Sequence, residues 1–566
     1  MSTLDWLVIA FTTIGIVGYG LWRGRNNKDI EGYIKADNSL PWYTITLAVI
    51  STQASAVTFL SAPGQAYTDG MRFVLFYLGL PLAMIFVSAV LIPIYYRLNV
   101  YTAYQFLETR FDAKVRVLIA LFFLAQRSLA AAISIAAPAI VLTIVLGWNI
   151  FLTNLLLGGI VIIYTVSGGA KAVSQTQKLQ MIIILAGMFV AGVYLFWLLP
   201  YQMTFHEMMQ VAGKAGKINT MDFNFDLNNR YNFWSGLLGG FFLQLAYFGT
   251  DQSQVGRYLG GKNMTQSRLG LLFNGIFKIP MQFSILLIGV ILFVFYQFEQ
   301  HPVFFNPVEL KKIQNSTYAK EFQTIEKEYE QQLNNRGEKA KILLESIRQD
   351  NAVEQATQAF IKEDQQLQSI KKKAVALMKK NDPDSNTNDT NYIFLTFVVR
   401  YLPQGLIGLL IVVILFASMS TTASELSALG STTLLDIYRK AVPENEQNKR
   451  RNVFLSKAFV VFWGIITLIF ANLATQLGTL IEAVNILGSL FYGTILGVFL
   501  LALFAYKIVS AKAVFIAALI AEVSVVFLFW QNDIAYLWLN MIGCILVVVY
   551  AFLLAPFFTK SKTTES

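Results

Sequence analysis

Long apolar runs separated by short polar loops recur along nearly the whole chain. A helix needs about 20 apolar residues to cross the hydrocarbon core of a bilayer, and lipid tolerates only helices or closed barrels. These runs are too long for barrel strands, so the pattern predicts an all-α, polytopic membrane protein. Thirteen spans are predicted, at residues 3–22, 43–66, 72–97, 118–147, 150–167, 178–199, 233–257, 270–297, 404–428, 454–473, 478–506, 511–530 and 533–556.

Basic residues gather in every second loop between these spans, and the intervening loops carry very few of them. Cytoplasmic loops of membrane proteins are enriched in Lys and Arg. The pattern therefore predicts that the N-terminus lies outside the cell and the C-terminus in the cytoplasm, as an odd number of spans requires. We expect a cell membrane, and specifically a bacterial inner membrane. The basic loops contain Arg23, Arg25, Lys28, Arg97, Arg110, Lys114, Arg116, Lys171, Arg257, Lys262, Arg268, Arg439, Lys440, Lys449, Arg450, Arg451, Lys560 and Lys562.

The composition excludes several classes of protein. The chain is 55% hydrophobic and 14% charged, and its net charge of +10 is accounted for by these loops, so no nucleic-acid partner is expected. Cys544 is the single cysteine, which excludes an intramolecular disulfide. His206 and His301 both fall in polar segments, and no pair of acids lies within a span. Neither a zinc site nor an intramembrane enzyme is therefore expected.

Two hydrophilic segments, 200–231 and 298–391, interrupt the spans, both on the predicted outer side. The second alternates Glu, Gln and Lys between Glu309 and about Lys380, which is typical of a solvent-exposed helical hairpin or coiled coil. A polar linker around Asp382 closes it. Two interpretations remain open: a tolerated insertion without a role in function, or an element that binds a protein partner.

The stretch from Ser51 to Gly64 is unusual for a spanning helix because it combines hydroxyl residues and an amide with a Pro63-Gly64 pair expected to stop the helix. A helix that opens within the membrane can offer backbone oxygens to an ion. In the ninth span, Ala417, Ser420 and Thr421 share one helical face. Together these oxygens suit a hard monovalent cation. Ordinary packing of Ser and Thr between helices is the alternative.

Several motifs together resemble the sodium/solute symporters, the family of sodium–sugar, sodium–sialate, sodium–proline, sodium–iodide and sodium–multivitamin transporters. The resemblance covers essentially all thirteen spans. The motifs are Ser55-Ala56-Val57-Thr58 before Pro63, Gly168-Gly169-Ala170-Lys171-Ala172-Val173, Gly249-Thr250-Asp251-Gln252 with Gly256-Arg257, and Ala417 to Thr421 followed by Asp436-Ile437-Tyr438.

The resemblance implies a five-plus-five inverted repeat, as in the bacterial leucine transporter. The first repeat would be 41–199 and the second 232–506, interrupted by the insertion at 298–391. Residues 1–40 would add an extra helix and an inner loop, and 511–566 would add the C-terminal helices and a short inner tail. Na⁺ would be the co-transported ion. Its implied ligands are the carbonyls of Ser51, Ala54 and Ala417 and the hydroxyls of Ser420 and Thr421.

One departure from the family pattern concerns a second sodium site. Many members place an Asp after the Gly-Gly motif, where this chain has Thr176-Gln177-Lys178. The other half of that site would fall on Ala423 and Ser424, of which only Ser424 keeps a hydroxyl. We therefore predict one sodium ion per transport cycle.

The predicted substrate cavity lies at the break in the second span. The resemblance places an inner gate at Tyr247 and an intramembrane lysine at Lys278; an interfacial tyrosine and a lysine reaching towards water are the alternatives. Sugar carriers of the family have an acid at the position of Tyr77 and a glutamine at that of Thr58, and both are absent here. The predicted lining residues are Gln53, Thr58, Phe76, Tyr77, Arg127, Gln244, Tyr247 and Lys278.

Arg127 has two interpretations. It either pairs with Glu425 or reaches the inner surface, or, with Lys278, it makes the cavity cationic and selects a small organic anion. The predicted function is thus a sodium-coupled symporter of a small organic solute, with a carboxylate favoured. A sugar or another neutral solute remains an alternative, as does a non-transporting membrane sensor built on the same helices.

Overall fold

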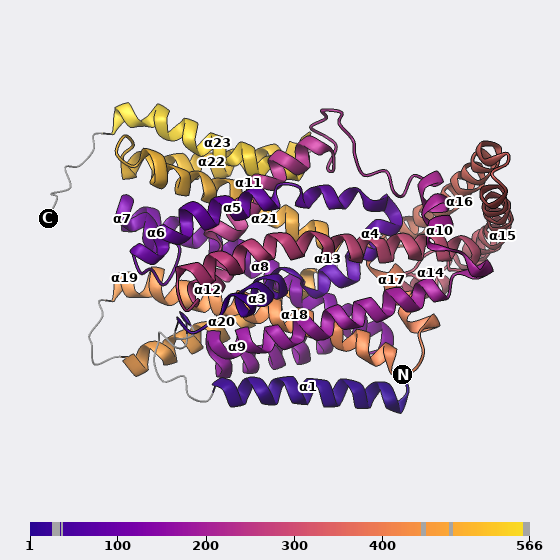
Figure 1. The fold of residues 1–566 in the computed structure, drawn as a ribbon, viewed down its shortest axis with the longest axis horizontal. Helices are drawn as coiled ribbons and strands as arrows, with labels where there is room; N and C mark the ends of the chain where they lie inside the picture. The colour runs from indigo at the N-terminus through magenta and orange to yellow at the C-terminus, as the bar shows by residue number, and fades with distance from the viewer. Residues whose placement is uncertain (25–33, 36–37, 443–448, 475–478, 532, 559–566) are drawn as a thin grey trace.

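The computed structural model describes residues 1–24, 34–35, 38–442, 449–474, 479–531 and 533–558. These residues form a bundle of roughly parallel helices from which a helical hairpin projects at one end (Figure 1). No β-strand occurs among them, apart from an isolated bridge between Leu40 and Gly261. The predicted inner loop around Arg25 and Lys28 and the tail from Thr559 lie outside the described residues.

Eleven helical segments of the described chain are long and apolar enough to cross a membrane. Two helices, at 42–69 and 235–259, are interrupted. The count is lower than the thirteen predicted spans because residues 56–97 form one segment that joins α4 to the third predicted span, and because the pieces of the helix at 235–259 are too short to count. The continuous segments include α1 (Thr3–Gly24), α8 (Ala113–Leu146), α9 (Ile150–Trp197), α13 (Met264–Phe298), α18 (Leu406–Thr432), α20 (Lys449–Ala474), α21 (Leu480–Leu500), α22 (Ala511–Gln531) and α23 (Tyr536–Leu554). The shorter pieces are α5 (Leu80–Phe86), α6 (Ile92–Arg97), α7 (Gln105–Arg110) and α19 (Arg439–Ala441).

The first interruption separates α3 (Trp42–Gln53) from α4 (Ala56–Asp69). Ser55 donates its backbone N–H to the carbonyl of Gln53 at 3.1 Å, not to that of Ser51 as a continuing helix would require. The expected stop at Pro63-Gly64 is wrong, because α4 continues through both residues. The break lies at Ala54, where contacts with α18 take over the freed polar groups.

The second interruption separates α11 (Gly240–Thr250), which follows a π-helical turn at Ser235–Gly239, from α12 (Gln252–Leu259). Asp251 has an extended backbone, and its Oδ1 accepts hydrogen bonds from the N–H and the hydroxyl of Ser253 at 2.8 and 2.6 Å. The Asp251 carboxylate thus caps one of the free N–H groups that begin α12, and its backbone carbonyl accepts from the N–H groups of Gln254 and Val255. The two interrupted helices therefore expose polar backbone inside the bundle.

A glycine divides α9 into the two spans that the sequence predicts. Gly169 has φ 60° and ψ 179°, a conformation that side-chain-bearing residues rarely adopt. The apolar segments on either side, at 150–167 and 172–197, can then cross the membrane in opposite directions. This explains why the Gly-Gly motif lies at the entrance to the sixth predicted span.

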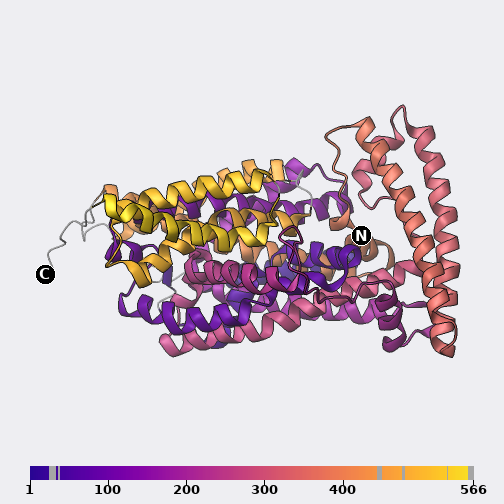
Figure 2. The ribbon, with the colours of Figure 1, turned by 90° about the horizontal axis from the view of Figure 1, so that it is seen from above.

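The hydrophilic insertion is a helical hairpin, as predicted, made of α14 (Pro307–Gln314), α15 (Ala319–Gln349) and α16 (Val353–Asn381). It has an apolar cluster of its own that includes Phe304, Phe322 and Leu367. Figure 2 shows the hairpin at the end of the bundle where the N-terminus lies, opposite the end of α23. The polar segment 200–231 contains a further helix, α10 (Phe205–Lys214), which packs against α15.

A helix that the sequence analysis missed, α17 (Thr390–Tyr401), follows the hairpin and packs on α4. Its first turn lies so close to α4 that a Cβ atom on Gly64 would be 2.0 Å from the carbonyl oxygen of Thr390. The side chain of Asn391 accepts a hydrogen bond from the Ser61 hydroxyl at 2.7 Å. The helix that follows the hairpin therefore packs directly on α4 at Ser61 and Gly64.

Candidate functional site

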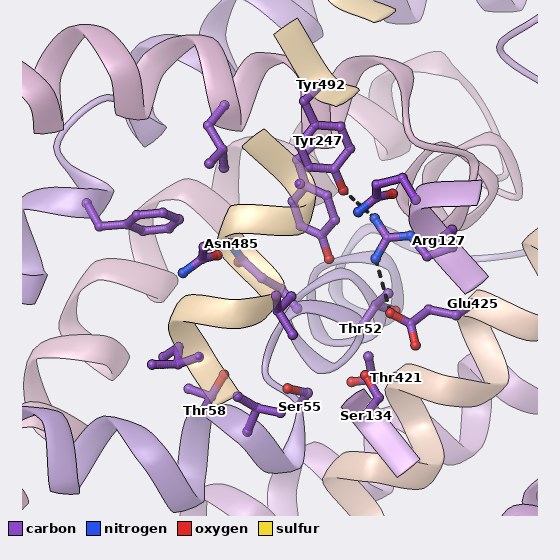
Figure 3. Close-up of a pocket in the computed structure, with 18 of the residues that line it drawn as sticks. Thr52, Ser55, Thr58, Arg127, Ser134, Tyr247, Thr421, Glu425, Asn485 and Tyr492 are labelled. Carbon is purple, nitrogen blue, oxygen red and sulfur yellow. Dashed lines mark hydrogen bonds and ion pairs between the residues drawn. The ribbon is translucent and has the colours of Figure 1, made fainter. Parts of the chain in front are cut away.

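A cavity of about 80 Å³ lies where the break between α3 and α4 meets α8, α11, α18 and α21 (Figure 3). Polar side chains of six helices, α3, α4, α8, α11, α18 and α21, face it. It is lined by Thr52, Gln53, Ser55, Val57, Thr58, Phe76, Tyr77, Gln126, Arg127, Ser134, Leu243, Tyr247, Thr421, Glu425, Ile481, Val484, Asn485, Gly488 and Tyr492.

Four of the five predicted ion ligands form one hydrogen-bonded cluster at the edge of this cavity. The carbonyl of Ser51 accepts from the hydroxyls of Ser420 at 3.2 Å and Thr421 at 3.3 Å. The Ser420 hydroxyl also lies 3.1 Å from the Ala417 carbonyl and accepts from the Ser51 hydroxyl at 2.9 Å. All four residues are buried. Oxygen atoms from α3 and α18 thus converge at the position where the helix break frees a carbonyl.

The fifth predicted ligand, Ala54, is buried at the break itself, with φ −84° and ψ 74°. Its N–H donates to the carbonyl of Ile50 at 2.7 Å. No hydrogen bond joins it to the other four predicted ligands within the described part of the chain. The non-helical backbone leaves its carbonyl outside the regular helical ladder of both α3 and α4, as an ion ligand requires.

Gln177, on α9, occupies the region next to this cluster. Its Nε2 donates to the Ser420 carbonyl at 2.8 Å and to the Ser424 hydroxyl at 2.6 Å. The hydroxyls of Thr52 and Ser424 are 3.0 Å apart. A neutral amide therefore links α3, α9 and α18 next to the predicted ion ligands.

Arg127 is the centre of a buried ionic network on the other side of the cavity (Figure 3). It forms a salt bridge with Glu425 at 3.1 Å and another with Asp251, and it also donates to the hydroxyl of Tyr492. The Tyr492 hydroxyl in turn donates to Asp251 at 2.8 Å. The predicted pairing of Arg127 with Glu425 is present. The network joins α8, α18 and α21 to the break in the second interrupted helix.

The charge balance of this network differs from the cationic cavity that the sequence suggested. One guanidinium group faces two carboxylates, and Arg127 uses both of its terminal nitrogens to bind them. The Nε of Arg127 and the Oε2 of Glu425 are the atoms of these two side chains that find no partner among the described residues. Since a buried charge is tolerated only when paired, the network fixes its members and leaves Nε for a further contact.

Tyr247 lies beside Arg127 and Tyr492, on α11 just before the break at Asp251. Its ring is 5.4 Å from the guanidinium carbon of Arg127 and 5.9 Å from the ring of Tyr492. Its hydroxyl accepts from the Nε2 of Gln254 at 2.5 Å. An aromatic residue attached next to a helix break can change position when the break moves, which is the geometry a gate requires.

Six of the eight predicted substrate residues line the cavity, namely Gln53, Thr58, Phe76, Tyr77, Arg127 and Tyr247. Gln244 and Lys278 do not. On α11 the cavity is lined by Leu243 and Tyr247, four residues apart, so Gln244 points to another side of the helix. Lys278 is fully buried, and its ammonium lies 5.6 Å from the ring centroid of Tyr77, which faces the cavity.

The sequence analysis missed several lining residues, among them Gln126, Ser134, Asn485 and Tyr492. Gln126 and Asn485 are amides inside apolar segments, which is a usable signal because polar groups are expensive within a membrane. Tyr492 gave no such signal, since tyrosines are common in these helices. Asp251 was noticed as part of a motif, but its partner Arg127 is 124 positions away in the chain.

Comparison with known proteins gives a consistent result. The model of the sodium:solute symporter family matches residues 33–324 and 374–521. The human sodium/iodide cotransporter is 32% identical over 300 residues, which cover 52% of this chain and 45% of that protein. The sodium-dependent multivitamin transporter of Oryctolagus cuniculus is 25% identical over 521 residues, 89% of this chain and 66% of that protein.

The sodium-coupled monocarboxylate transporter 2 of Bos taurus is 27% identical over 274 residues, 48% of this chain and 44% of that protein. Each of these alignments therefore covers less than two thirds of the relative's own length. All three relatives are transporters and not enzymes. A solved structure of a Na⁺-coupled sialic acid symporter in a substrate-bound, outward-open state aligns over 99% of both chains, with a TM-score of 0.76 and 19% identity. This establishes the fold, with its inverted repeat.

Proposed function

The chain belongs to the sodium:solute symporter family, and from this premise we propose that it is a sodium-coupled symporter that imports a small organic solute by alternating access. The observation that carries the proposal is the freed carbonyl of Ser51 in contact with the hydroxyls of Ser420 and Thr421. With the carbonyls of Ala54 and Ala417, these atoms would form a neutral, five-oxygen site. Such a site holds Na⁺ weakly enough to release it.

The proposed cycle couples the two ligands through the two helices that hold the ion. Sodium would bind from the outside and hold α3 and α18 together, which stabilises the neighbouring cavity in a form that binds solute. By linkage, the solute then tightens sodium binding by the same factor. The membrane potential contributes about 2.3 kcal/mol per charge per 100 mV to an ion that crosses the whole field. Both ligands would leave past Tyr247.

We propose one sodium ion per cycle. Gln177 supplies amide N–H groups to the Ser420 carbonyl and the Ser424 hydroxyl. A cation between these two oxygens would meet the Nε2 donor, and the acceptor that Gln177 offers is a neutral amide Oε1, without a partner among the described residues, instead of a carboxylate. A Hill coefficient near one for sodium in transport assays is therefore expected, and a value near two would contradict the proposal.

We assign the solute to the small organic carboxylates. The similar proteins include transporters of monocarboxylate and iodide and a symporter of sialic acid. The Nε of Arg127 is a buried donor without a partner among the described residues. A neutral solute is the second candidate. It is favoured by the two carboxylates on Arg127, which leave the cavity without an excess of positive charge.

In this proposal the repeats span 41–199 and 232–506, with the N-terminus and the hairpin outside and the end of α23 inside. The location would be a cell membrane, and a bacterial inner membrane is expected. The partners would be sodium, the solute and membrane lipid. A non-transporting sensor on the same fold remains the alternative, and it differs in one measurable respect, because a sensor moves no solute.

The decisive experiment is uptake into proteoliposomes with an inward sodium gradient, compared with potassium on both sides. Propionate and propionamide form a matched pair, since they differ mainly in charge. Uptake of propionate that requires the gradient, with weak competition by propionamide, is the expected result. Equal competition by the amide would favour the neutral solute, and gradient-independent uptake of every solute tested would contradict sodium coupling.

The role of Arg127 is tested by binding measurements on an Arg127→Ala variant that retains its fold. Loss of propionate binding, with propionamide binding unaffected, is expected if its Nε contacts the carboxylate. An unchanged carboxylate affinity would remove Arg127 from the substrate site. Lys278 is proposed to act through Tyr77, so Lys278→Met should alter the affinities for both compounds by a similar factor.

A further inference from the structure

A second cavity lies between the hairpin and the membrane bundle. It has a volume of about 370 Å³, compared with about 80 Å³ for the central cavity. The outer end of α4, α13, α15 and α16 each contribute side chains to its wall, as does the loop that carries Lys217. The hairpin therefore covers a space large enough for a small molecule, at the ends of the second and eighth predicted spans.

Two of the three cations that line this cavity are already paired. Arg336 forms a salt bridge with Asp364 at 3.3 Å, and Lys371 forms one with Asp389 at 2.8 Å. Lys217 has no carboxylate within 4 Å in the described part of the chain. Its ammonium donates to the carbonyl of Thr68 and lies 4.6 Å from the ring centroid of Phe293.

The remaining acid of the wall, Asp69, lies at the exposed mouth and accepts a hydrogen bond from Gln65 at 2.5 Å. Lys217 is more enclosed, and burial lowers the pKa of its ammonium group although the charges of Asp364 and Asp69 oppose the shift. An unpaired cation in such a place is an unfavourable arrangement that a bound anion would relieve.

The backbone holds Lys217 in position. The Lys217 carbonyl accepts a hydrogen bond from the N–H of Met71 at 2.8 Å. Gly70 has φ +73°, and a Cβ atom there would lie 2.5 Å from the same carbonyl. The loop is thus fitted against the end of α4, so the ammonium group needs little rearrangement before a ligand binds.

Aromatic rings form the rest of the wall. Tyr67 makes edge-to-face contacts with Phe293 at 5.7 Å and Phe305 at 6.2 Å between ring centroids, and Tyr329 faces the same space. An inorganic anion would gain little from such a surface. A carboxylate with an apolar or aromatic body would bury that body against the rings while its charge meets Lys217.

We propose that this cavity is a second binding site, distinct from the central one, for a small organic carboxylate. The proposal does not depend on the identity of the transported solute, because it rests on Lys217 and the aromatic wall alone.

A ligand in this site would influence the C-terminal part of α4 through a short chain of contacts. The N–H of Phe305 and the ammonium of Lys371 both bind the carboxylate of Asp389, at 2.9 and 2.8 Å. The next residue, Thr390, begins α17 and contacts α4 at Gly64. A ligand against Phe305 would stabilise this arrangement.

The test is equilibrium binding of radiolabelled benzoate to the purified full-length protein in potassium buffer without sodium. Saturable binding is expected, and Lys217→Gln should weaken it at least tenfold. Lys214→Gln is the matched control, because Lys214 lies nearby, is exposed and pairs with Glu354 at 3.8 Å. This control should bind as the unmodified protein does.

A second variant, Gln368→Trp, fills the cavity without removing a charge and should also abolish benzoate binding. Benzamide should bind far more weakly than benzoate. Equal affinity of Lys217→Gln and the unmodified protein, or no saturable benzoate binding at up to tens of millimolar, would overturn the proposal. Failure of carboxylate uptake in proteoliposomes would instead contradict the proposed solute class and leave this site intact. Sodium-driven import of benzoate would identify the bound carboxylate as a solute, and binding without import would identify it as a ligand that is not transported.

Discussion

At the level of single residues, Thr421 offers the most direct test of the ion site. Its hydroxyl lies 3.3 Å from the Ser51 carbonyl, whereas the hydroxyl of the adjacent Thr422 finds no partner among the described residues. Removal of one ligand oxygen is expected to cost about 1.4 kcal/mol or more, which is a tenfold change in affinity. Thr421→Ala should therefore raise the sodium concentration for half-maximal uptake about tenfold.

Thr422→Ala is the matched control for this experiment, because Thr422 is also buried on α18 but its hydroxyl makes no hydrogen bond to α3 among the described residues. Its sodium dependence should stay within about twofold of the unmodified protein. Equal shifts in both variants would show that the Thr421 effect reflects packing of α18 and not ion binding.

We propose a single sodium ion per cycle because of the Gln177 side chain, and substitution of this residue tests that proposal. Gln177→Asp would replace the amide donor next to Ser424 with a carboxylate, the ligand that a second cation requires. The Hill coefficient for sodium should rise from near one towards two. Gln177→Asn, which is shorter but neutral, should keep a coefficient near one, and a rise in both variants would refute the role of charge.

The residues of the site were predictable to different degrees from the sequence. Ser420 and Thr421 share one helical face with Ala417, which predicted that their oxygens lie together, while ordinary packing of Ser and Thr remained the alternative. Arg127 was recognisable as unusual, but its partners Asp251 and Glu425 are 124 and 298 positions away. No local pattern determines which of two interpretations of such a residue is correct, because only the packing of three helices brings the charges together.

At the level of helices, local patterns predicted the spans, but contacts between distant residues determined where a helix breaks. Apolar length alone predicted the spans, since it depends only on composition over some 20 residues. The position of the helix break was not predictable in this way. Proline removes one helical hydrogen bond, and α4 tolerates that loss at Pro63. The actual break at Ala54 is stabilised by hydroxyl groups of α18, more than 360 positions away.

The contact between α4 and α17 makes a prediction at this scale. Alanine normally stabilises a helix interior relative to glycine by about 1 kcal/mol. At Gly64, however, the new Cβ atom would be 2.0 Å from the Thr390 carbonyl, so α17 would have to move away. Gly64→Ala should therefore open the central cavity, which Thr58 lines, from the side of the hairpin.

This opening can be measured by thiol labelling of a cysteine introduced at Thr58, because the single native cysteine, Cys544, is buried. Labelling should be several times faster in the Gly64→Ala background. Gly159→Ala is the control, since a Cβ atom there meets nothing within 4 Å. Identical labelling rates in the two backgrounds would show that α17 does not close the cavity.

At the level of the whole molecule, the fold and the family match divide the chain in the same way. The family model matches up to residue 324 and again from 374, so the unmatched residues 325–373 form the outer part of α15 and α16. This part has apolar contacts of its own, including Leu333 and Leu367, and it also packs on the bundle through Leu344, which belongs to the main apolar cluster. Sequence composition recognised the hairpin as an insertion but could not place it over α4.

Removal of residues 325–373 therefore tests whether the hairpin belongs to the transport machinery. Thr324 and Ala376 lie on one groove of the hairpin, so a short glycine-rich turn can reconnect α15 and α16 near this level. Closure of a short loop costs little free energy. The shortened protein should remain folded and keep its sodium dependence, because Ser51, Ser420 and Thr421 are untouched.

The same deletion removes Arg336, Asp364 and Lys371 from the second cavity and breaks the Lys371–Asp389 link to α17. Benzoate binding without sodium should therefore disappear while sodium-driven uptake persists at a lower maximal rate. Loss of both activities in a protein that still elutes as a single folded species would show that the hairpin is part of the transport cycle. Retention of both benzoate binding and uptake would show that the enclosed cavity does not bind the carboxylate. Measuring both properties therefore separates the role of the insertion from that of the bundle.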